Sequence, residues 1–280
     1  MEAAERRDTV ERRAPIAAGR IQRLVWGRSG RFISRGRLAA SSLYWLGWII
    51  VSPRAIVSAG VQREIEALGV GALRLVASAS VLVGLITTFQ VATQLTAFGA
   101  ENMAGRAIGW FAAREIGPLA VAILVIARSA ARTAGEFASM AAGGELDALR
   151  AMGLDPAKYL VAPKLAAFLV ALPTLTIFAD GLIVLGGWLG SSVVLGYSTH
   201  FFLEQFRSSF DLYDVFVGVA KAIVFAVVIA LVAADEGLSV RPHVESIGAA
   251  ATRAVVFCLI GVLAADTLIN AVFYFIPGLS

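Results

Sequence analysis

The sequence is poor in charged residues and nearly free of cysteine and histidine. Charged residues make up 16% of its 280 positions, whereas a soluble domain carries roughly 25%. The single cysteine, Cys258, excludes an intrachain disulfide. The two histidines, His200 and His243, have no second His or Cys at metal-ligand spacing, so nothing in the spacing suggests a metal site.

The sequence also lacks the short motifs of several enzyme classes. It contains no G-x-x-x-x-G-K-[ST], which excludes nucleotide binding through a P-loop. It contains no G-x-S-x-G, no H-E-x-x-H and no Cys–His pairing suited to catalysis. We therefore expect a chain that has no catalytic activity and binds no cofactor or metal of its own.

Long apolar runs are what the sequence has in abundance. Hydrophobic residues make up 58% of it, and residues 75–100 and 181–203 contain no Asp, Glu, Lys or Arg. Each run exceeds the ~18 apolar residues that mark a membrane-spanning helix, and no alternating β-barrel segments occur. The sequence predicts an all-α polytopic membrane protein. Its five transmembrane helices are predicted at 71–98, 108–133, 164–196, 214–235 and 254–276.

The first sixty residues are basic and differ from these spans. Thirteen of the 24 Lys and Arg residues lie in the first 74 positions. Residues 1–27 have mixed charges and no apolar signal-peptide core, which predicts a disordered cytoplasmic tail. Residues 28–60 contain a short apolar stretch at 38–53 whose aromatic residues favour the headgroup boundary, so an interfacial elbow helix is predicted; a tilted true span is the alternative. This position of the basic residues favours membrane anchoring over nucleic-acid binding.

Basic residues also distinguish the loops between the predicted spans. The loops at 134–163 and 236–253 each have two, whereas those at 101–107 and 197–213 each have one. With the N-terminus inside, the positive-inside rule places 134–163 and 236–253 in the cytoplasm. We therefore expect a multi-pass protein of the inner (plasma) membrane with a cytoplasmic N-terminus and a periplasmic or extracellular C-terminus.

The second span carries charges next to a helix-breaking pair. A charge at the bilayer centre costs roughly 2.5–3.5 kcal/mol or more, so such residues usually face the bundle interior or a cavity. Arg114 and Glu115 precede Gly117-Pro118, which should kink or break the helix. Arg114 and Glu115 are predicted either to line a cavity on a substrate path or to form an ion pair at the outer interface.

Three other spans each contain one ionisable residue: Asp180, Lys221 and Asp266. Asp180 and Lys221 have opposite charges and could pair. Together with Glu115, the three residues could form the proton relay of an ion-coupled secondary transporter, which is the alternative function. As structural hydrogen-bonding anchors of the bundle, they would have no transport role.

The segment between the second and third spans is predicted to be a separate short helix. Gly143-Gly144 and Gly153 bound residues 145–152. Two carboxylates lie in the first turn, where they favour the helix dipole, and apolar residues three apart predict one stripe. The helix could lie on the membrane, but its acidic residues suit an anionic leaflet poorly, so docking to another protein is favoured. The residues predicted to dock are Glu145, Leu146, Asp147, Leu149, Arg150 and Met152.

Two stretches carry ordered motifs. The first is EFASMAAGGELDALRAMGLDPAKYLVAPK at 136–164. In it a Glu is followed four residues later by a Met, and then by Leu-Asp-Ala-Leu, a Pro, Tyr-Leu and a second Pro. The second is REIGPL at 114–119. These motifs resemble the MlaE/YrbE family, the permease subunits of MCE-associated lipid ABC transporters. Arg128 matches the family's arginine flanked by small residues. The sequence departs from the family at Gly144, usually Glu, and at Lys164, usually Arg.

The resemblance implies a permease that moves phospholipid or a related lipid. Residues 61–280 would form its five-span domain and work as a homodimer. ATP and Mg²⁺ would be bound by a separate cytoplasmic ATPase subunit, and helix 145–152 would be the coupling helix that docks it. A hexameric MCE-domain protein outside the membrane would exchange lipid with a cavity lined by the first two spans. The lipid-pathway residues implied by position are Leu95, Phe98, Arg114 and Glu115, for which ordinary helix packing is the alternative role.

Overall fold

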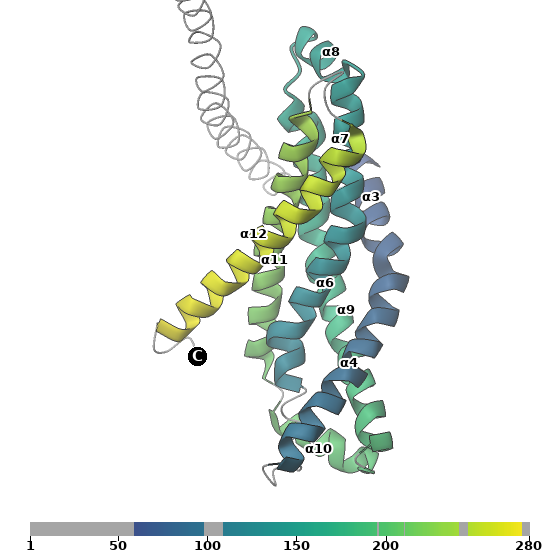
Figure 1. Ribbon diagram of the computed structural model, residues 1–280, viewed down its shortest axis with the longest axis vertical. Coiled ribbons are helices and arrows are strands. Elements are labelled where there is room, and N and C mark those ends of the chain that lie inside the picture. The colour runs from purple at the N-terminus through teal and green to yellow at the C-terminus, as the bar shows by residue number, and fades with distance from the viewer. Residues whose placement is uncertain (1–58, 98–108, 195, 210, 241–245, 276–280) are drawn as a thin grey trace, which may run out of the picture.

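The computed structural model describes residues 59–97, 109–194, 196–209, 211–240 and 246–275. In these ranges every regular element is helical, and five helices are long and apolar enough to cross a membrane. They run side by side in one elongated bundle (Figure 1). The prediction of an all-α polytopic membrane protein with five spans is confirmed. The predicted N-terminal tail, the predicted elbow helix and Phe98 lie outside the described residues.

Each of the first three spans combines α-helix with short π-helical turns, whereas the last two are uninterrupted α-helices. The first span comprises α3 (Ala59–Ile65), η1 (Glu66–Val70) and α4 (Gly71–Ala97). The second comprises η3 (Ala112–Ile116), α6 (Gly117–Val125), η4 (Ile126–Ala130) and α7 (Ala131–Ala142). The third comprises η5 (Ala157–Val161) and α9 (Ala162–Val194). The fourth and fifth are α11 (Leu212–Leu238) and α12 (Ile247–Phe275).

Gly117-Pro118, which was predicted to kink or break the second span, does not break it. The π-turn η3 ends at Ile116, and α6 begins at Gly117 with Pro118 in its first turn. Proline removes one N–H from the continuous helix, and membrane helices accommodate the freed backbone groups by local π adjustments. The chain therefore passes the proline by changing to π-helical geometry immediately before it. Such π-bulges are frequent at functional sites.

Glycines allow the first and third spans to approach closely. A Cβ added at Gly84 would collide with the carbonyl of Ile183, and one added at Gly186 would collide with the carbonyl of Val81. Small residues at such positions let membrane helices pack backbone against backbone. Thr88 extends this contact, because its hydroxyl donates to the carbonyl of Gly187 over 3.2 Å as well as to its own helix.

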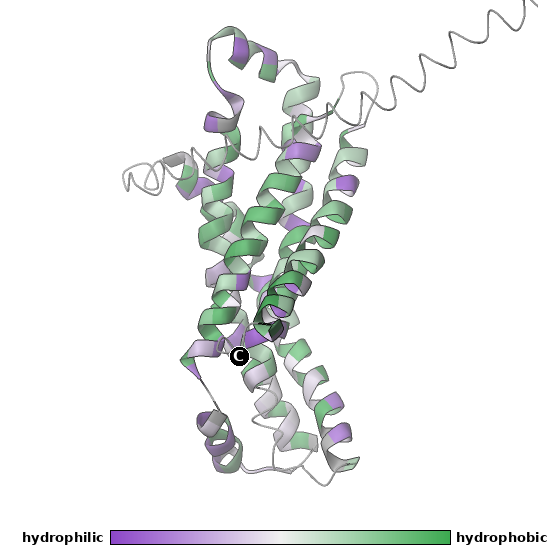
Figure 2. Cartoon of the chain, turned by 90° about the vertical axis from the view of Figure 1, so that its left-hand side faces the viewer, coloured by the Kyte–Doolittle hydropathy of each residue, from purple (hydrophilic) through white to green (hydrophobic). Residues whose placement is uncertain are grey.

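The two ends of the bundle carry different short helices. Helix α8 (Glu145–Ala151) lies at one end, which we call the α8 end, and α10 (Thr199–Ser209) lies at the other, which we call the α10 end (Figure 1). Hydrophobic residues dominate the length between them, and hydrophilic residues gather on both short helices (Figure 2). The sequence did not predict α10. It is held by Phe202, which is fully buried, and by a hydrogen bond of 3.3 Å from Trp188 Nε1 to Thr199 Oγ1.

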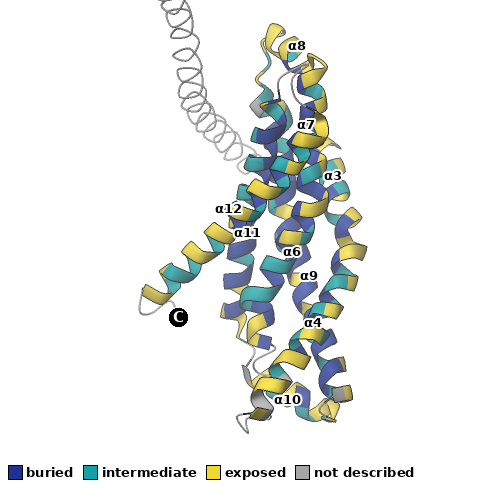
Figure 3. Ribbon diagram, in the orientation of Figure 1, coloured by how far each residue is buried: buried dark blue, intermediate teal, exposed yellow. Residues whose placement is uncertain are grey.

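Helix α12 packs only partly on the rest of the chain. It leaves the bundle toward its C-terminal end (Figure 1), and exposed residues follow it there (Figure 3). Most of its exposed side chains are apolar, including Leu263, Leu268 and Val272. The core of the molecule therefore lies among α6, α9 and α11, with α4 and α12 on its outside.

Candidate functional site

Helix α8 is separated from the spans by glycines with left-handed backbone. α7 ends at Ala142, and Gly144 (φ 76°) and Gly153 (φ 74°) lie on either side of α8. L-residues are strained in this region and glycine is not, so each glycine permits a sharp change of direction. The helix ends at Ala151, one residue earlier than the sequence predicts.

The apolar residues predicted to form one stripe on α8 differ in burial. Leu146 is buried against Ala138, Ala141 and other residues of the bundle, so it fixes α8 to the spans. Met152 is 65% exposed and Leu149 is half-buried. An exposed ion pair of 3.1 Å joins Asp147 and Arg150. The residues that α8 leaves on its outer side are Glu145, Asp147, Leu149, Arg150 and Met152.

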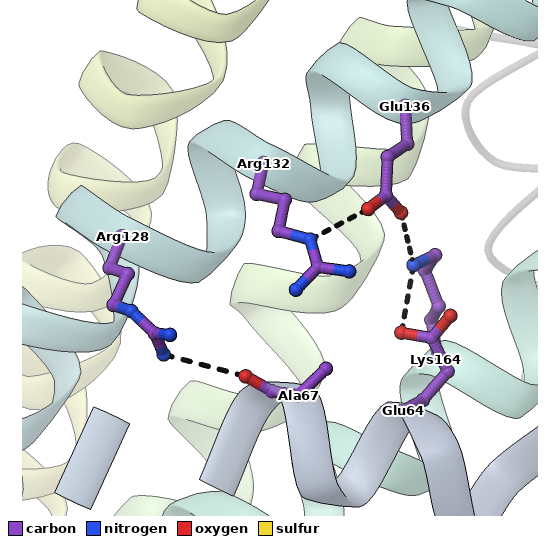
Figure 4. Close-up of polar contacts among 6 residues, drawn as sticks. All are labelled: Glu64, Ala67, Arg128, Arg132, Glu136 and Lys164. Carbon is purple, nitrogen blue, oxygen red and sulfur yellow. Dashed lines mark hydrogen bonds and ion pairs between the residues drawn. The ribbon is translucent and has the colours of Figure 1, made fainter. Parts of the chain in front are cut away.

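Four ionisable side chains from α3, α7 and α9 form what we call the Lys164 cluster (Figure 4). Lys164 Nζ donates to Glu64 Oε2 over 2.9 Å and to Glu136 Oε2 over 2.7 Å. Arg132 Nε donates to Glu136 Oε1 over 2.7 Å. Only 8% of the Lys164 side chain is exposed, and the two cations balance the two carboxylates. The cluster joins α3, α7 and α9, and so links the helices that precede and follow α8 in the chain.

A further polar contact joins the first and second spans at their π-turns. Arg128, in η4, donates to the carbonyl of Ala67, in η1, over 3.4 Å (Figure 4). A Cβ at Gly71 would touch the guanidinium of Arg128. The small residue at 71 therefore leaves the space that this arginine occupies.

Toward the α10 end, Arg114 connects the second span to the fourth and fifth. Its guanidinium lies 3.4 Å from Asp214 Oδ1. It also lies 5.7 Å from the ring centroid of Trp110 and 5.4 Å from that of Phe273, distances at which a cation is attracted to an aromatic face. Arg114 is thus held within the chain by three groups.

Glu115, Lys221 and Asp266 form a second charged group, which we call the Lys221 cluster. Lys221 Nζ lies 2.7 Å from Glu115 Oε1 and 3.0 Å from Asp266 Oδ1. Only 1% of the Lys221 side chain is exposed, so its charge is compensated almost entirely by these carboxylates. Lys221 therefore pairs with Glu115 and Asp266 and not with Asp180. Arg114 and Glu115 likewise each pair with another span, so they do not form an interfacial ion pair with one another.

The structure places the predicted site residues in two regions. The α8 residues lie at the α8 end, whereas Arg114 and Glu115 lie toward the α10 end. Leu95 lies in the last turn of α4, and its side chain is outside the described part, as is Phe98. Among the described residues no group of three or more His, Cys, Asp or Glu could hold a metal ion.

Sequence reasoning missed several partners of these ionisable residues. Glu64 and Asp214 were not expected to contribute to a site, and neither was the ion pair of 3.1 Å between Glu236 and Arg253. Each acidic residue lies within or beside a hydrophobic run, and that position was the only indication in the sequence that it takes part in a site. Its partner comes from another span, and no spacing in the sequence identifies it.

Comparison with known proteins adds a family. Residues 61–272 match a family model described as Permease MlaE. A probable ABC transporter permease protein of Rickettsia typhi is 29% identical over 225 residues, which cover 80% of this chain and 86% of the relative. The intermembrane phospholipid transport system permease protein MlaE of Haemophilus influenzae is 29% identical over 216 residues (76% and 82%). The chloroplastic protein TRIGALACTOSYLDIACYLGLYCEROL 1 of Arabidopsis thaliana is 26% identical over 212 residues (76% and 61%).

Proposed function

The chain belongs to the MlaE permease family, and we propose that it is the membrane subunit of an ABC transporter that moves phospholipid or a related lipid. The name of the Haemophilus influenzae relative supports the lipid, and that of the Rickettsia typhi relative supports the transporter class. The observation on this chain that carries the proposal is α8, a short exposed helix held on the bundle by Leu146 and the Lys164 cluster.

We expect α8 to dock a separate ATPase subunit from the cytoplasmic side. Its outer residues provide an apolar contact through Leu149 and Met152 beside the charged pair of Asp147 and Arg150. An amphipathic helix of this kind suits a groove on a partner. A displacement of α8 would reach α7 and α9 together, because α8 lies between those helices in the chain and the Lys164 cluster joins them to each other. ATP and Mg²⁺ would be bound by that partner.

The lipid pathway is proposed on the first two spans toward the α10 end, between two copies of the chain. Glu115 keeps 29% of its side chain exposed while it pairs with Lys221, so one face of the carboxylate is available to a polar headgroup. Arg114 would stabilise the side of this pathway, because it contacts the fourth and fifth spans. Leu95 and Phe98 stay proposed acyl-chain contacts. A hexameric MCE-domain protein on the outer side would exchange lipid with this path.

The pairing of Lys221 supports a structural role for most intramembrane charges. Three of the four residues named for the ion-coupled alternative, Glu115, Lys221 and Asp266, are engaged with one another. A buried charge that is paired and hydrogen-bonded is stabilised, whereas removal of its partner is costly. No contact among the described residues favours ion coupling over the permease role.

The docking role is tested by co-expression of the chain with an ABC ATPase of the same organism, followed by affinity purification. Leu149→Arg should abolish co-purification of the ATPase, because it places a charge in the apolar part of the contact. Glu204→Arg is the matched control, since it introduces the same side chain at an exposed position of α10 at the opposite end. Wild-type recovery of the ATPase with Leu149→Arg would refute the docking role.

A further inference from the structure

A cavity of about 330 Å³ lies within the chain toward the α10 end, apart from the lipid pathway proposed above. Its volume falls in the range of small-molecule sites, roughly 300–1,000 Å³. Its wall is almost wholly apolar and comes from the second, third and fourth spans and α10. The larger wall contributions are Ala112, Ala113, Ile177, Val184, Phe206 and Val215.

One carboxylate, that of Asp180, lies in this wall. Asp180 is only 9% exposed, and neither of its carboxylate oxygens has a hydrogen-bond partner among the described residues. A Cβ added at Gly117 would collide with Asp180 Oδ1. Glycine at 117, between the π-turn η3 and Pro118, therefore leaves the space that the carboxylate needs.

Asp180 has no cationic partner among the described residues, whereas the other buried acids of those residues each have one. Asp214 pairs with Arg114 and Glu236 pairs with Arg253. The neighbouring Lys221 cluster cannot supply a cation to Asp180, because its single ammonium already faces two carboxylates. Among the described residues, Arg114 and Lys221 are thus both engaged by other carboxylates, and the carboxylate of Asp180 faces a cavity without either of them.

The chemistry of the cavity restricts its occupant. A carboxyl group in apolar surroundings either takes up a proton or, if it stays ionised, needs a counter-charge beside it. Mg²⁺ keeps several of its waters and Ca²⁺ takes six to eight oxygen ligands, and a wall that is apolar apart from one carboxylate suits neither ion. A primary ammonium carries one positive charge and three donors, enough to satisfy both oxygens of one carboxylate, and its carbon chain would lie against the apolar wall.

We infer that this cavity binds the primary ammonium group of an amphipathic amine, with Asp180 as its counter-ion. The ammonium could belong to an aminophospholipid headgroup or to a free alkylamine. The inference goes beyond the proposed function, since it holds whether or not α8 docks an ATPase.

The test uses the purified full-length chain in nanodiscs of phosphatidylcholine, a lipid that has no primary amine. n-Hexylammonium should raise the thermal unfolding midpoint in a saturable way, because a ligand that binds only the native state stabilises it. n-Hexanol, which has the same chain without the charge, should leave the midpoint unchanged. No rise with n-hexylammonium, or an equal rise with n-hexanol, would overturn the inference.

Three variants locate the effect. Asp180→Asn should abolish the response, and Val184→Phe should abolish it by filling the cavity while the carboxylate remains. Thr176→Val is the matched control, since Thr176 is buried one turn away on α9, outside the cavity wall, with its hydroxyl bound to its own helix; this variant should respond like the wild type. A wild-type response in Asp180→Asn would refute the site. ATPase co-purification should be unchanged in all three.

Nanodiscs that contain phosphatidylethanolamine distinguish the two sources of the ammonium. If the lipid headgroup is the occupant, phosphatidylethanolamine should raise the wild-type midpoint and remove the response to n-hexylammonium by competition. If a free amine is the occupant, the response should persist in these nanodiscs. Both results support an ammonium site, provided that the response disappears in Asp180→Asn.

Discussion

Replacement of Lys164 by methionine tests whether the Lys164 cluster holds the helices around α8 together. Methionine keeps most of the apolar stem of lysine and removes the ammonium that bridges Glu64 and Glu136. Breaking a buried ion pair by removing one partner costs ~3–5 kcal/mol. Here Glu64 and Glu136 keep 27% and 33% of their side chains exposed, and Arg132 still compensates Glu136. We therefore expect the free energy of unfolding to fall by about 2–3 kcal/mol.

The assay is unfolding of the purified chain by SDS in mixed micelles, with Lys164→Arg as the matched control. Arginine keeps the positive charge and can donate to both carboxylates, so Lys164→Arg should retain most of the stability. A second effect is expected in the complex. Lys164→Met should lower lipid movement per ATP hydrolysed more than it lowers ATPase co-purification, because α8 remains present but is less firmly joined to α7 and α9.

Two results would refute this reasoning. If Lys164→Met unfolds within ~0.5 kcal/mol of the wild type, the size of a typical surface substitution, the cluster does not stabilise the bundle. If Lys164→Arg is as damaging as Lys164→Met, the loss comes from packing and not from charge. A double-mutant cycle with Glu64→Gln gives the pairwise energy directly, and coupling of 0.5–3 kcal/mol is typical of contacting residues.

The other predictions concern the second ion cluster and the attachment of α8. Lys221→Met should destabilise the bundle by ~3 kcal/mol, because it removes a fully buried ammonium from two carboxylates that are only partly exposed; addition of Glu115→Gln and Asp266→Asn should recover most of that loss in SDS unfolding. If the triple variant is no more stable than Lys221→Met, the charge argument fails. Leu146→Ala should remove about 2–4 kcal/mol of local packing under α8 and accelerate amide hydrogen exchange at 145–152. Unchanged exchange there would contradict the anchoring role of Leu146.

The number of spans could be predicted from the sequence, whereas their ends could not. Hydropathy identifies the runs because membrane-spanning helices must be long and apolar. It ended the second span at 133 and began the third at 164, since charges follow or precede those positions. The structure continues the second helix to Ala142 and starts the third earlier. Glu136 and Lys164, which lie near those predicted ends, are paired with each other in the Lys164 cluster.

The separate helix at 145–151 could be predicted because its boundaries are local. Glycine marks both of its ends, and carboxylates mark its first turn. Helix α10 was missed because its apolar residues continue the hydrophobic run of the third span. Gly196, with φ 64°, separates the two, but no second glycine or proline follows it to mark the turn.

The charged sites could be predicted only in part. Sequence identified Arg114, Glu115, Asp180, Lys221 and Asp266 as unusual, since charges are costly in a membrane. It could not pair them, because partners such as Glu115 and Lys221 are 106 residues apart and their contact depends on how three spans pack. The unpaired state of Asp180 is visible only once the other acids have been matched with their cations.

The most direct test of the central claim, that α8 carries an ATPase subunit, is site-specific photocrosslinking in the membrane. The photoreactive residue p-benzoylphenylalanine is introduced in place of Met152, the C-cap of α8, and, as a control, in place of Glu204 on α10, with the ATPase co-expressed. The account predicts an adduct of permease and ATPase from position 152 and none from position 204. An adduct absent from position 152, with the ATPase present in the same membranes, would contradict it.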